Sequence, residues 1–268
     1  MPGAEANLIA PAFVAYLTGA AAALIYLWTR HGLLARAIPV LTGLGLALHT
    51  AALGVRWAAA GHWPFTSLYE FLTLFAWGLG GATLLTVWRW RMTVTAAFTL
   101  PLAVGLLGVA SLLPSEVRPL APALQSVWLQ LHVAAAILAY AAFTISFALA
   151  VLYLLSERRA DSRLPGLPPA EVLDRYTHSS VAFGFAFQTL LLITGAVWAE
   201  DVWGAWWSWD PKETWALVTW LIYALYLHAR TARGWKGRRA AWLAVAGFAA
   251  VLFTLLGVSL LIPGLHSY

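Results

Sequence analysis

The sequence contains no cysteine in its 268 residues. The chain therefore forms no disulfide, offers no thiolate ligand to a metal and performs no thiol exchange itself. Any thiol chemistry in which it takes part must use sulfur from a partner.

Charged residues are also scarce, at 10% of the chain against 62% for hydrophobic residues. A soluble domain has about 25% charged residues, so water is not the main solvent of this chain. Apolar stretches of about 20 residues recur along it, each long enough to cross a hydrocarbon core of about 30 Å. In lipid, backbone groups pair within such a segment, and helices follow. The sequence predicts an all-α, polytopic membrane protein embedded in the lipid bilayer.

We expect about eight transmembrane helices in a single membrane domain over residues 1–268. Apolar runs and loop signals place them near 8–28, 38–55, 67–88, 93–113, 127–155, 180–198, 212–229 and 241–262. The first run is too long for a signal peptide and no basic region precedes it, so we expect a retained helix. The longest connection, 156–178, is charged and rich in proline, and we predict a cytoplasmic loop there.

The basic residues set the predicted orientation, because Lys and Arg favour cytoplasmic loops. Thirteen of the sixteen fall on one side of the predicted helices, and three, Arg56, Arg118 and Lys212, fall on the other. The larger group marks the inside, so an even number of spans places both termini outside. The formal charge of +5 needs no nucleic acid to explain it, since these residues lie in short loops.

Six tryptophans fall within residues 198–215, the tryptophan-rich segment. Residues 199–214 of this segment form a predicted external loop between the sixth and seventh helices. Each tryptophan alone fits an interfacial aromatic belt, but a belt spreads over many helix ends. A concentration of large flat rings beside Asp210, Lys212 and Glu213 suits a flat aromatic ligand that carries acidic groups. The candidate binding residues are Trp203, Trp206, Trp207, Trp209 and Asp210.

Local chemistry accounts for part of this segment without a ligand. Asp210 fits a helix N-cap, Pro211 the first helical position and Glu213 the third, which together form a capping box. A further role of these residues in ligand binding stays open, because helix N-termini also attract carboxylates.

Two of the seven histidines share the predicted outer level of this segment. His132 lies near the outer end of the fifth helix, and His266 lies just beyond the eighth. Two neutral imidazoles beside a platform of indoles are a plausible axial pair for haem iron.

His228 lies about 26 Å along the seventh helix from the tryptophan-rich segment, so it cannot ligate the same iron. It is either an inner haem ligand or a snorkelling interfacial residue. His49, within the second helix, and His62, in an outer turn, stay undecided.

These residues resemble the tryptophan-rich "WWD" signature of haem-handling membrane proteins, and within that superfamily the CcsA (ResC) family of system II cytochrome c synthase subunits. The similarity extends from the second helix to the last residue. It is carried by the runs Gly61 to Glu70, Trp128 to His132, Trp203 to Trp215, Tyr223 to His228 and Gly264 to Tyr268.

The resemblance implies that His132 and His266 are the external axial ligands of haem b and that the WWD loop cradles the ring between them. It implies that His228 shares an inner haem with a histidine of a CcsB (ResB) partner. Catalysis, as a cytochrome c synthase or haem lyase, would then require CcsB, and an apocytochrome c with a Cys-x-x-Cys-His segment would be the client. We expect the bacterial plasma membrane as its location, ahead of the thylakoid, because no transit peptide is present.

Three alternatives stay open. A system I type haem chaperone or exporter would hand haem on without attaching it to a client. A transporter of another small molecule would use the tryptophans as an aromatic gate, but broken helices near the midplane are not evident. A structural subunit of a respiratory complex would leave the clustered histidines and indoles without a reason.

Overall fold

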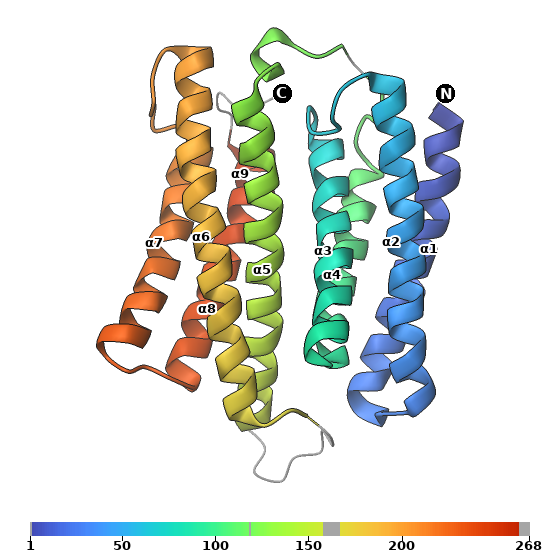
Figure 1. The fold of residues 1–268 in the computed structure, drawn as a ribbon, viewed down its shortest axis with the longest axis vertical. Helices are drawn as coiled ribbons and strands as arrows, with labels where there is room; N and C mark the ends of the chain where they lie inside the picture. The colour runs from blue at the N-terminus through green and yellow to red at the C-terminus, as the bar shows by residue number, and fades with distance from the viewer. Residues whose placement is uncertain (1, 118, 158–166, 263–268) are drawn as a thin grey trace. The chain divides into compact units, whose positions relative to one another are not determined.

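A computed structural model describes residues 2–117, 119–157 and 167–262 (Figure 1). Across these ranges the chain is helical with short connections, and they contain no strand. The chain divides into two compact units: unit 1 comprises Met1–Ala121 and Asp161–Leu167, and unit 2 comprises Pro122–Ala160 and Pro168–Tyr268.

Unit 1 is a bundle of four long helices. These are α1 (Pro2–Thr29), α2 (Gly32–Ala60), α3 (Leu68–Trp90) and α4 (Ala96–Ala110), with the short 3₁₀-helix η1 (Thr93–Thr95) between the last two. Helix α1 packs against α2 and α4, and α3 packs against its neighbours α2 and α4. The buried ring of Tyr16 occupies the space left by Gly45 and Gly80, which brings α1, α2 and α3 close together.

Unit 2 is a second helical bundle. It contains the 3₁₀-helix η2 (Pro122–Leu124), α5 (Val127–Glu157), α6 (Ala170–Trp203), α7 (Pro211–Ala232), α8 (Arg238–Leu252), the π-helical turn η3 (Phe253–Gly257) and α9 (Val258–Leu261). Helix α6 packs along α5, while α8 contacts α5 and α7. The helix α5 provides the core of this unit, since most of its central residues are buried.

Small residues set the close approach of α6 to α5. A Cβ atom at Gly184 would lie 2.6 Å from the ring of Phe143, and one at Gly195 would lie 2.7 Å from Nδ1 of His132. Glycine at these two positions lets large side chains of α5 rest directly on the backbone of α6, as is common in membrane helix pairs.

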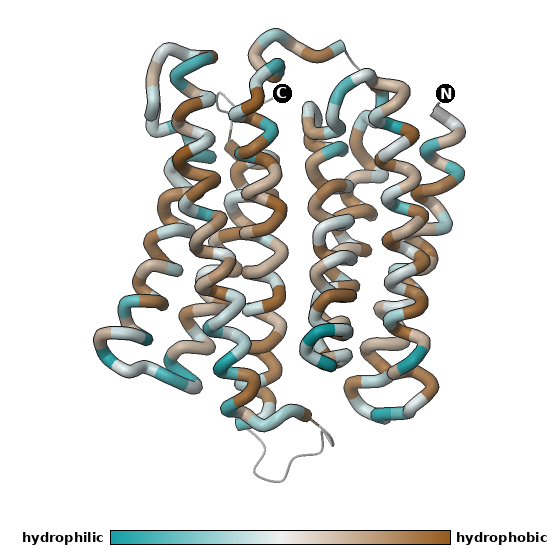
Figure 2. Tube along the Cα trace, viewed as in Figure 1, coloured by the Kyte–Doolittle hydropathy of each residue, from teal (hydrophilic) through white to brown (hydrophobic). Residues whose placement is uncertain are grey.

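The prediction of an all-α, multi-span membrane protein is confirmed. In the described ranges, seven helical stretches are long and apolar enough to cross a membrane, and the last of them runs from Arg238 to Leu261. The eighth long helix, α7, is not among them, because charged residues near both its ends and its Trp and Tyr residues lower its hydropathy. Hydrophilic residues concentrate at helix ends and loops, as Figure 2 shows.

Helix α6 differs most from its predicted bounds. It begins at Ala170, ten residues before the predicted start at 180, and ends at Trp203 rather than 198. The charged sequence near its start suggested a loop, but Asp174 is satisfied within the fold. Its two carboxylate oxygens each lie 2.8 Å from Nη1 of Arg230, and its Oδ1 accepts the backbone N–H of Gly237 at 2.9 Å.

Candidate functional site

The tryptophan-rich segment consists of three local structures in unit 2. Its first residues form the last turn of α6, which ends at Trp203 and is followed by Gly204 in a left-handed conformation with φ of +70°. Residues 205–210 form a loop, and α7 begins at Pro211. The Gly204 N–H donates to the Glu200 carbonyl at 2.9 Å and completes the helix end.

The predicted capping box at the start of α7 is confirmed. The Asp210 side chain accepts the backbone N–H of Lys212 at 2.9 Å, and the Glu213 carboxylate accepts the N–H of Asp210 at 3.2 Å. The same Glu213 oxygen, Oε2, also accepts the N–H of Ser208 at 2.9 Å and its hydroxyl at 3.2 Å. One carboxylate therefore holds the end of the loop against the first turn of the helix.

Trp209 adopts a left-handed backbone conformation with φ of +60°. This conformation is unfavourable for a bulky residue. Two backbone N–H groups, those of Ser208 and Asp210, point to one oxygen of Glu213 on either side of it. Nearby backbone N–H groups that converge on an anion, with a left-handed residue in the turn, resemble a nest. The hydrogen bonds to Glu213 thus offset the strain in the Trp209 backbone.

The indole rings of the segment divide into buried and exposed members. Trp198 is 2% exposed and packs edge-on against Trp203, with ring centroids 4.9 Å apart. Trp207 and Trp209 also meet edge-on, with centroids 5.7 Å apart and planes at 86°. Trp206 and Trp209 are 58% and 68% exposed, so they present large apolar faces outside the core of the unit.

Trp207 also carries an unused hydrogen-bond donor. Its indole Nε1 is buried, and it has no hydrogen-bond partner among the described residues. A buried donor without a partner costs about 1–3 kcal/mol. An acidic group placed at this point of the loop would remove that cost.

His132 lies on α5 with its ring against α6. Its Nδ1 is 2.8 Å from the carbonyl oxygen of Leu191, and its ring fills the space beside Gly195. A carbonyl oxygen can only accept, so Nδ1 carries the proton, and in a neutral imidazole the lone pair is then on Nε2. Metal-ligating histidines commonly donate their second N–H to a carbonyl in this way.

His132 and the tryptophan-rich segment lie at the same end of unit 2. The indole N–H of Trp198 donates to the carbonyl of Ala123 at 2.9 Å, which joins α6 to the residues just before α5. Along α6, Gly195 is about 12 Å from Trp203. Figure 1 shows the α6–α7 loop and the start of α5 at one end of this unit.

The other two predicted iron ligands are His228 and His266, and the structure describes only His228. His228 lies on α7 and is exposed, about 26 Å along the helix from Pro211. The structure thus keeps it apart from His132 and the loop. His266 lies outside the described residues.

Two histidines left undecided by the sequence belong to unit 1. His49 is fully buried, packs edge-on against Tyr16 and has no hydrogen-bond partner for either ring nitrogen among the described residues. His62 lies in the turn before α3, where its Nδ1 is 3.0 Å from the carbonyl oxygen of Trp63.

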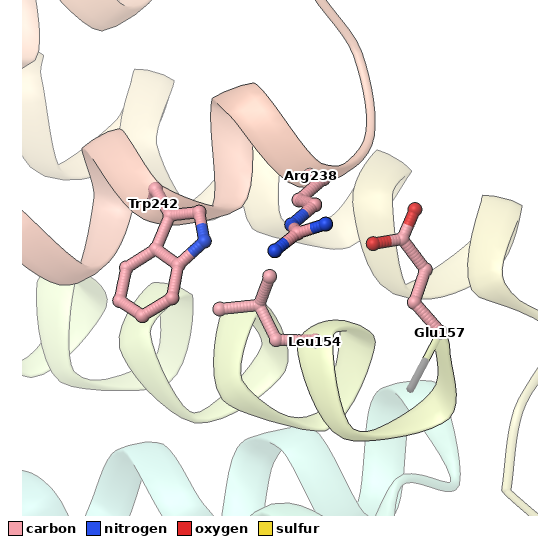
Figure 3. Close-up of a pocket in the computed structure, with 4 residues that line it drawn as sticks. All are labelled: Leu154, Glu157, Arg238 and Trp242. Carbon is pink, nitrogen blue, oxygen red and sulfur yellow. The ribbon is translucent and has the colours of Figure 1, made fainter. Parts of the chain in front are cut away.

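A small pocket occurs at the opposite end of α5. Figure 3 shows it between Leu154 and Glu157 on α5 and Arg238 and Trp242 on α8. Leu154 is about 33 Å along α5 from His132. This pocket is therefore separate from the predicted site.

Sequence reasoning missed three residues that shape the surroundings of His132. Gly195 and the Leu191 carbonyl support the imidazole, and Trp198 ties α6 to the segment before α5. Neither Gly195 nor Leu191 has a distinctive neighbourhood in the sequence. Trp198 could have been found, because it is the tryptophan of the segment that lies at the end of the predicted sixth helix.

Comparison with known proteins identifies the family of this chain. Residues 65–266 match the family described as "Cytochrome C assembly protein". The chain belongs to the cytochrome c assembly protein family.

Family members similar to this chain are named cytochrome c biogenesis protein CcsA. The protein of Microcystis aeruginosa is 38% identical over 291 aligned positions, which cover 86% of this chain and 89% of that protein. The protein of Prochlorococcus marinus is 40% identical over 253 positions, with 82% and 80% covered. The family match and these relatives span most of the chain.

A solved structure shares the fold of this family member. The cytochrome c heme lyase CcmF matches with a TM-score of 0.71 and 19% sequence identity. The match covers 94% of this chain and 46% of CcmF, so this chain spans less than half the length of that protein.

Proposed function

We propose that this chain handles haem in cytochrome c maturation. It binds haem b at the predicted outer end of unit 2 and presents it to an apocytochrome c. The observation that carries the proposal is the setting of His132: Nδ1 donates to the Leu191 carbonyl at 2.8 Å, so the ring offers its Nε2 lone pair at the same end as the tryptophan-rich segment.

The residues of the segment fit a flat ligand with acidic groups. Trp206 and Trp209 offer exposed aromatic faces, and the buried Nε1 of Trp207 is a donor without a partner among the described residues. A haem propionate is an acceptor of the required kind. His266, which lies outside the described residues, is the proposed second axial ligand on the strength of its sequence position.

Haem is the substrate in this proposal, and it supplies two vinyl groups to which thiols add. Each thiol S–H adds across one vinyl C=C bond: sulfur bonds to one carbon, hydrogen to the other, and no net oxidation occurs. Because this chain has no cysteine, both thiols come from the Cys-x-x-Cys-His segment of the client. The residues of this chain hold the ring and fix its orientation, which lowers the entropic cost of the attack.

His228 has a separate role in this scheme. It is exposed on α7, about 26 Å from the outer site, where it is open to a second protein. We propose that it shares an inner haem with a histidine of a CcsB (ResB) partner, in the bacterial plasma membrane or, as the second choice, the thylakoid membrane.

The visible absorption spectrum of the detergent-purified chain, expressed with and without a CcsB-type partner, tests the proposal. We expect a Soret band with bis-histidine α and β features in the wild type. Without the partner, the band should be lost or greatly weakened in His132→Gly and restored by added imidazole; with the partner, only the outer-site part of the band should respond. His31→Asn is the control: it alters an exposed histidine in unit 1 and keeps a side-chain acceptor at the start of α2.

Two outcomes would contradict the proposal. A wild-type protein that stays colourless when the partner and added haem are present would favour a transporter of another small molecule or a structural subunit of a respiratory complex. Haem bound by the chain without its partner that does not depend on His132 would remove the proposed outer site. If haem binds but no thioether forms with an apocytochrome c, the chain acts as a haem chaperone of the system I type.

A further inference from the structure

The contact between His132 and α6 is unusually close. A Cβ atom added at Gly195 would lie 2.7 Å from Nδ1 and 2.9 Å from Cε1 of the imidazole. Real Cβ atoms do not approach other atoms so closely, and the three nearest atoms all belong to His132. Any side chain at position 195 must therefore displace this ring.

We infer that Gly195 and the Leu191 carbonyl are positioning elements for His132, and that together they select the tautomer in which Nε2 bears the lone pair. This inference rests on the proposed function in so far as it concerns haem. Its structural part, the tautomer and position of the ring, concerns the chain alone.

The two elements depend on each other through the geometry of the helix. In an α-helix the N–H of residue 195 donates to the carbonyl of residue 191, so this carbonyl and this glycine lie one above the other on one face of α6. The imidazole reaches the oxygen of Leu191 only by passing over the bare Cα of Gly195. The hydroxyl of Thr194 favours the carbonyl of Leu190, at 2.7 Å, over that of Leu191, at 3.4 Å.

The hydrogen bond to Leu191 has a chemical consequence for an iron ligand. An imidazole that donates its Nδ1–H to an acceptor becomes more basic at Nε2, and its orientation is fixed. A more basic ligand favours ferric over ferrous iron. Loss of the bond should therefore weaken haem binding and raise the reduction potential of the bound iron.

Gly184 provides a matched control on the same helix. A Cβ there would lie 2.6 Å from Cε1 and 2.7 Å from Cδ1 of Phe143 and 3.2 Å from the backbone oxygen of Ala139, again on α5, an overlap at least as large as at Gly195. Gly184→Ala should thus disturb the packing of α5 on α6 as much as Gly195→Ala, but without contact to His132.

The first measurement needs no haem. Ring ¹⁵N–¹H spectra of the haem-free full chain, labelled at histidine, report the tautomer, and the resonance lost in His132→Ala assigns the signal. We expect the Nδ1–H tautomer in the wild type and in Gly184→Ala. In Gly195→Ala we expect its population to fall. An Nε2–H tautomer in the wild type would overturn the inference, whether or not the variants fold.

The second measurement uses the haem-loaded protein with its partner. We expect Gly195→Ala to lower haem affinity by about 10–100-fold, the usual effect of removing a ligand's supporting partner, and to raise the potential. Gly184→Ala should match the wild type in both. Equal affinity, potential and tautomer in the two alanine variants would overturn the inference while leaving the haem site intact. A haem content that is the same in His132→Ala as in the wild type would instead overturn the proposed function at the outer site.

A double variant separates the steric contact from a general folding defect. If Gly195→Ala alone is not recovered as folded protein, the combination with His132→Gly should restore folding, because the ring that the new Cβ meets is gone. Failure of the double variant to fold, where His132→Gly alone folds, would show that residue 195 acts on something other than His132.

Discussion

The Glu213 side chain accepts a hydrogen bond from the backbone N–H of Ser208, five residues earlier, at 2.9 Å. Through the same oxygen it accepts the N–H of Asp210, which begins the capping box of α7. One carboxylate therefore joins the start of the helix to the end of the tryptophan-rich loop. A substitution that disrupts one of them should also disrupt the other.

Glu213→Ala tests this coupling. We expect the variant to lose about 0.5–2 kcal/mol of stability, because the loop and the first turn of the helix lose the acceptor of the capping box, and the strained Trp209 backbone to relax. The change should appear as a lower melting temperature in detergent and as altered tryptophan emission. Glu171→Ala, at an exposed position in the first turn of α6, is the control. Equal melting curves for the two variants would contradict the coupling.

The sequence predicted part of this arrangement for a physical reason. The capping box depends on residue types at fixed short spacing, Asp210 and Glu213, so it can be identified without a structure. The left-handed Trp209 could not be predicted in the same way. Its conformation follows from two N–H groups that converge on one carboxylate, and no residue type at position 209 signals it.

The contacts of His132, in contrast, could not be predicted from the sequence. Its place near one end of α5 follows from counting residues along an apolar run. Its hydrogen bond to Leu191 crosses 59 residues of sequence and ends on a backbone atom, which every residue type has. Only the pairing of α5 with α6 reveals it.

Unit 1 contains a buried cluster of charged residues that the sequence did not predict. Arg56 is 1% exposed, and its Nε and Nη1 bond to Glu70 at 2.6 Å and Glu5 at 2.9 Å. Its Nη1 also donates to the carbonyl of Ser115 at 3.0 Å. The hydroxyl of Tyr69 donates to Glu5 at 2.8 Å. These contacts join the ends of α1, α2 and α3, which are far apart in sequence.

Arg56→Ala should be among the most destabilising substitutions in the chain. Removing one partner of a buried ion pair costs about 3–5 kcal/mol, because the remaining charges lose compensation. The melting temperature in detergent is the readout, and the exposed Arg89→Ala is the control. Adding Glu70→Gln to Arg56→Ala should recover part of the loss. Additive losses in the double variant would argue against a coupled pair.

Tyr16 offers a test of close packing in the same unit. Its hydroxyl is buried with no partner among the described residues, so Tyr16→Phe should leave the stability unchanged or raise it. Gly80→Ala places a Cβ 2.5 Å from this hydroxyl and should cost about 1–3 kcal/mol through overpacking. In the Tyr16→Phe background that cost should shrink. Melting curves of the four proteins form a double-mutant cycle, and a coupling of zero would rule out the contact.

Trp207→Phe tests the unused donor in the tryptophan-rich loop. Phenylalanine keeps an aromatic ring but removes the indole N–H, which has no partner among the described residues. The fold therefore loses no hydrogen bond, and we expect only a small drop in melting temperature. Haem affinity should fall more, because a hydrogen bond to a charged propionate is worth about 1.5–3 kcal/mol, or about 10–150-fold.

Haem titration followed by absorbance measures this effect, and Trp88→Phe, which alters an 84% exposed tryptophan of unit 1, is the matched control. If the propionate accepts the Trp207 N–H, esterifying both propionates should weaken binding to the wild type and leave binding to Trp207→Phe almost unchanged. An equal loss in both proteins would mean that the acidic groups of haem bind elsewhere. The Trp207 donor would then serve another ligand.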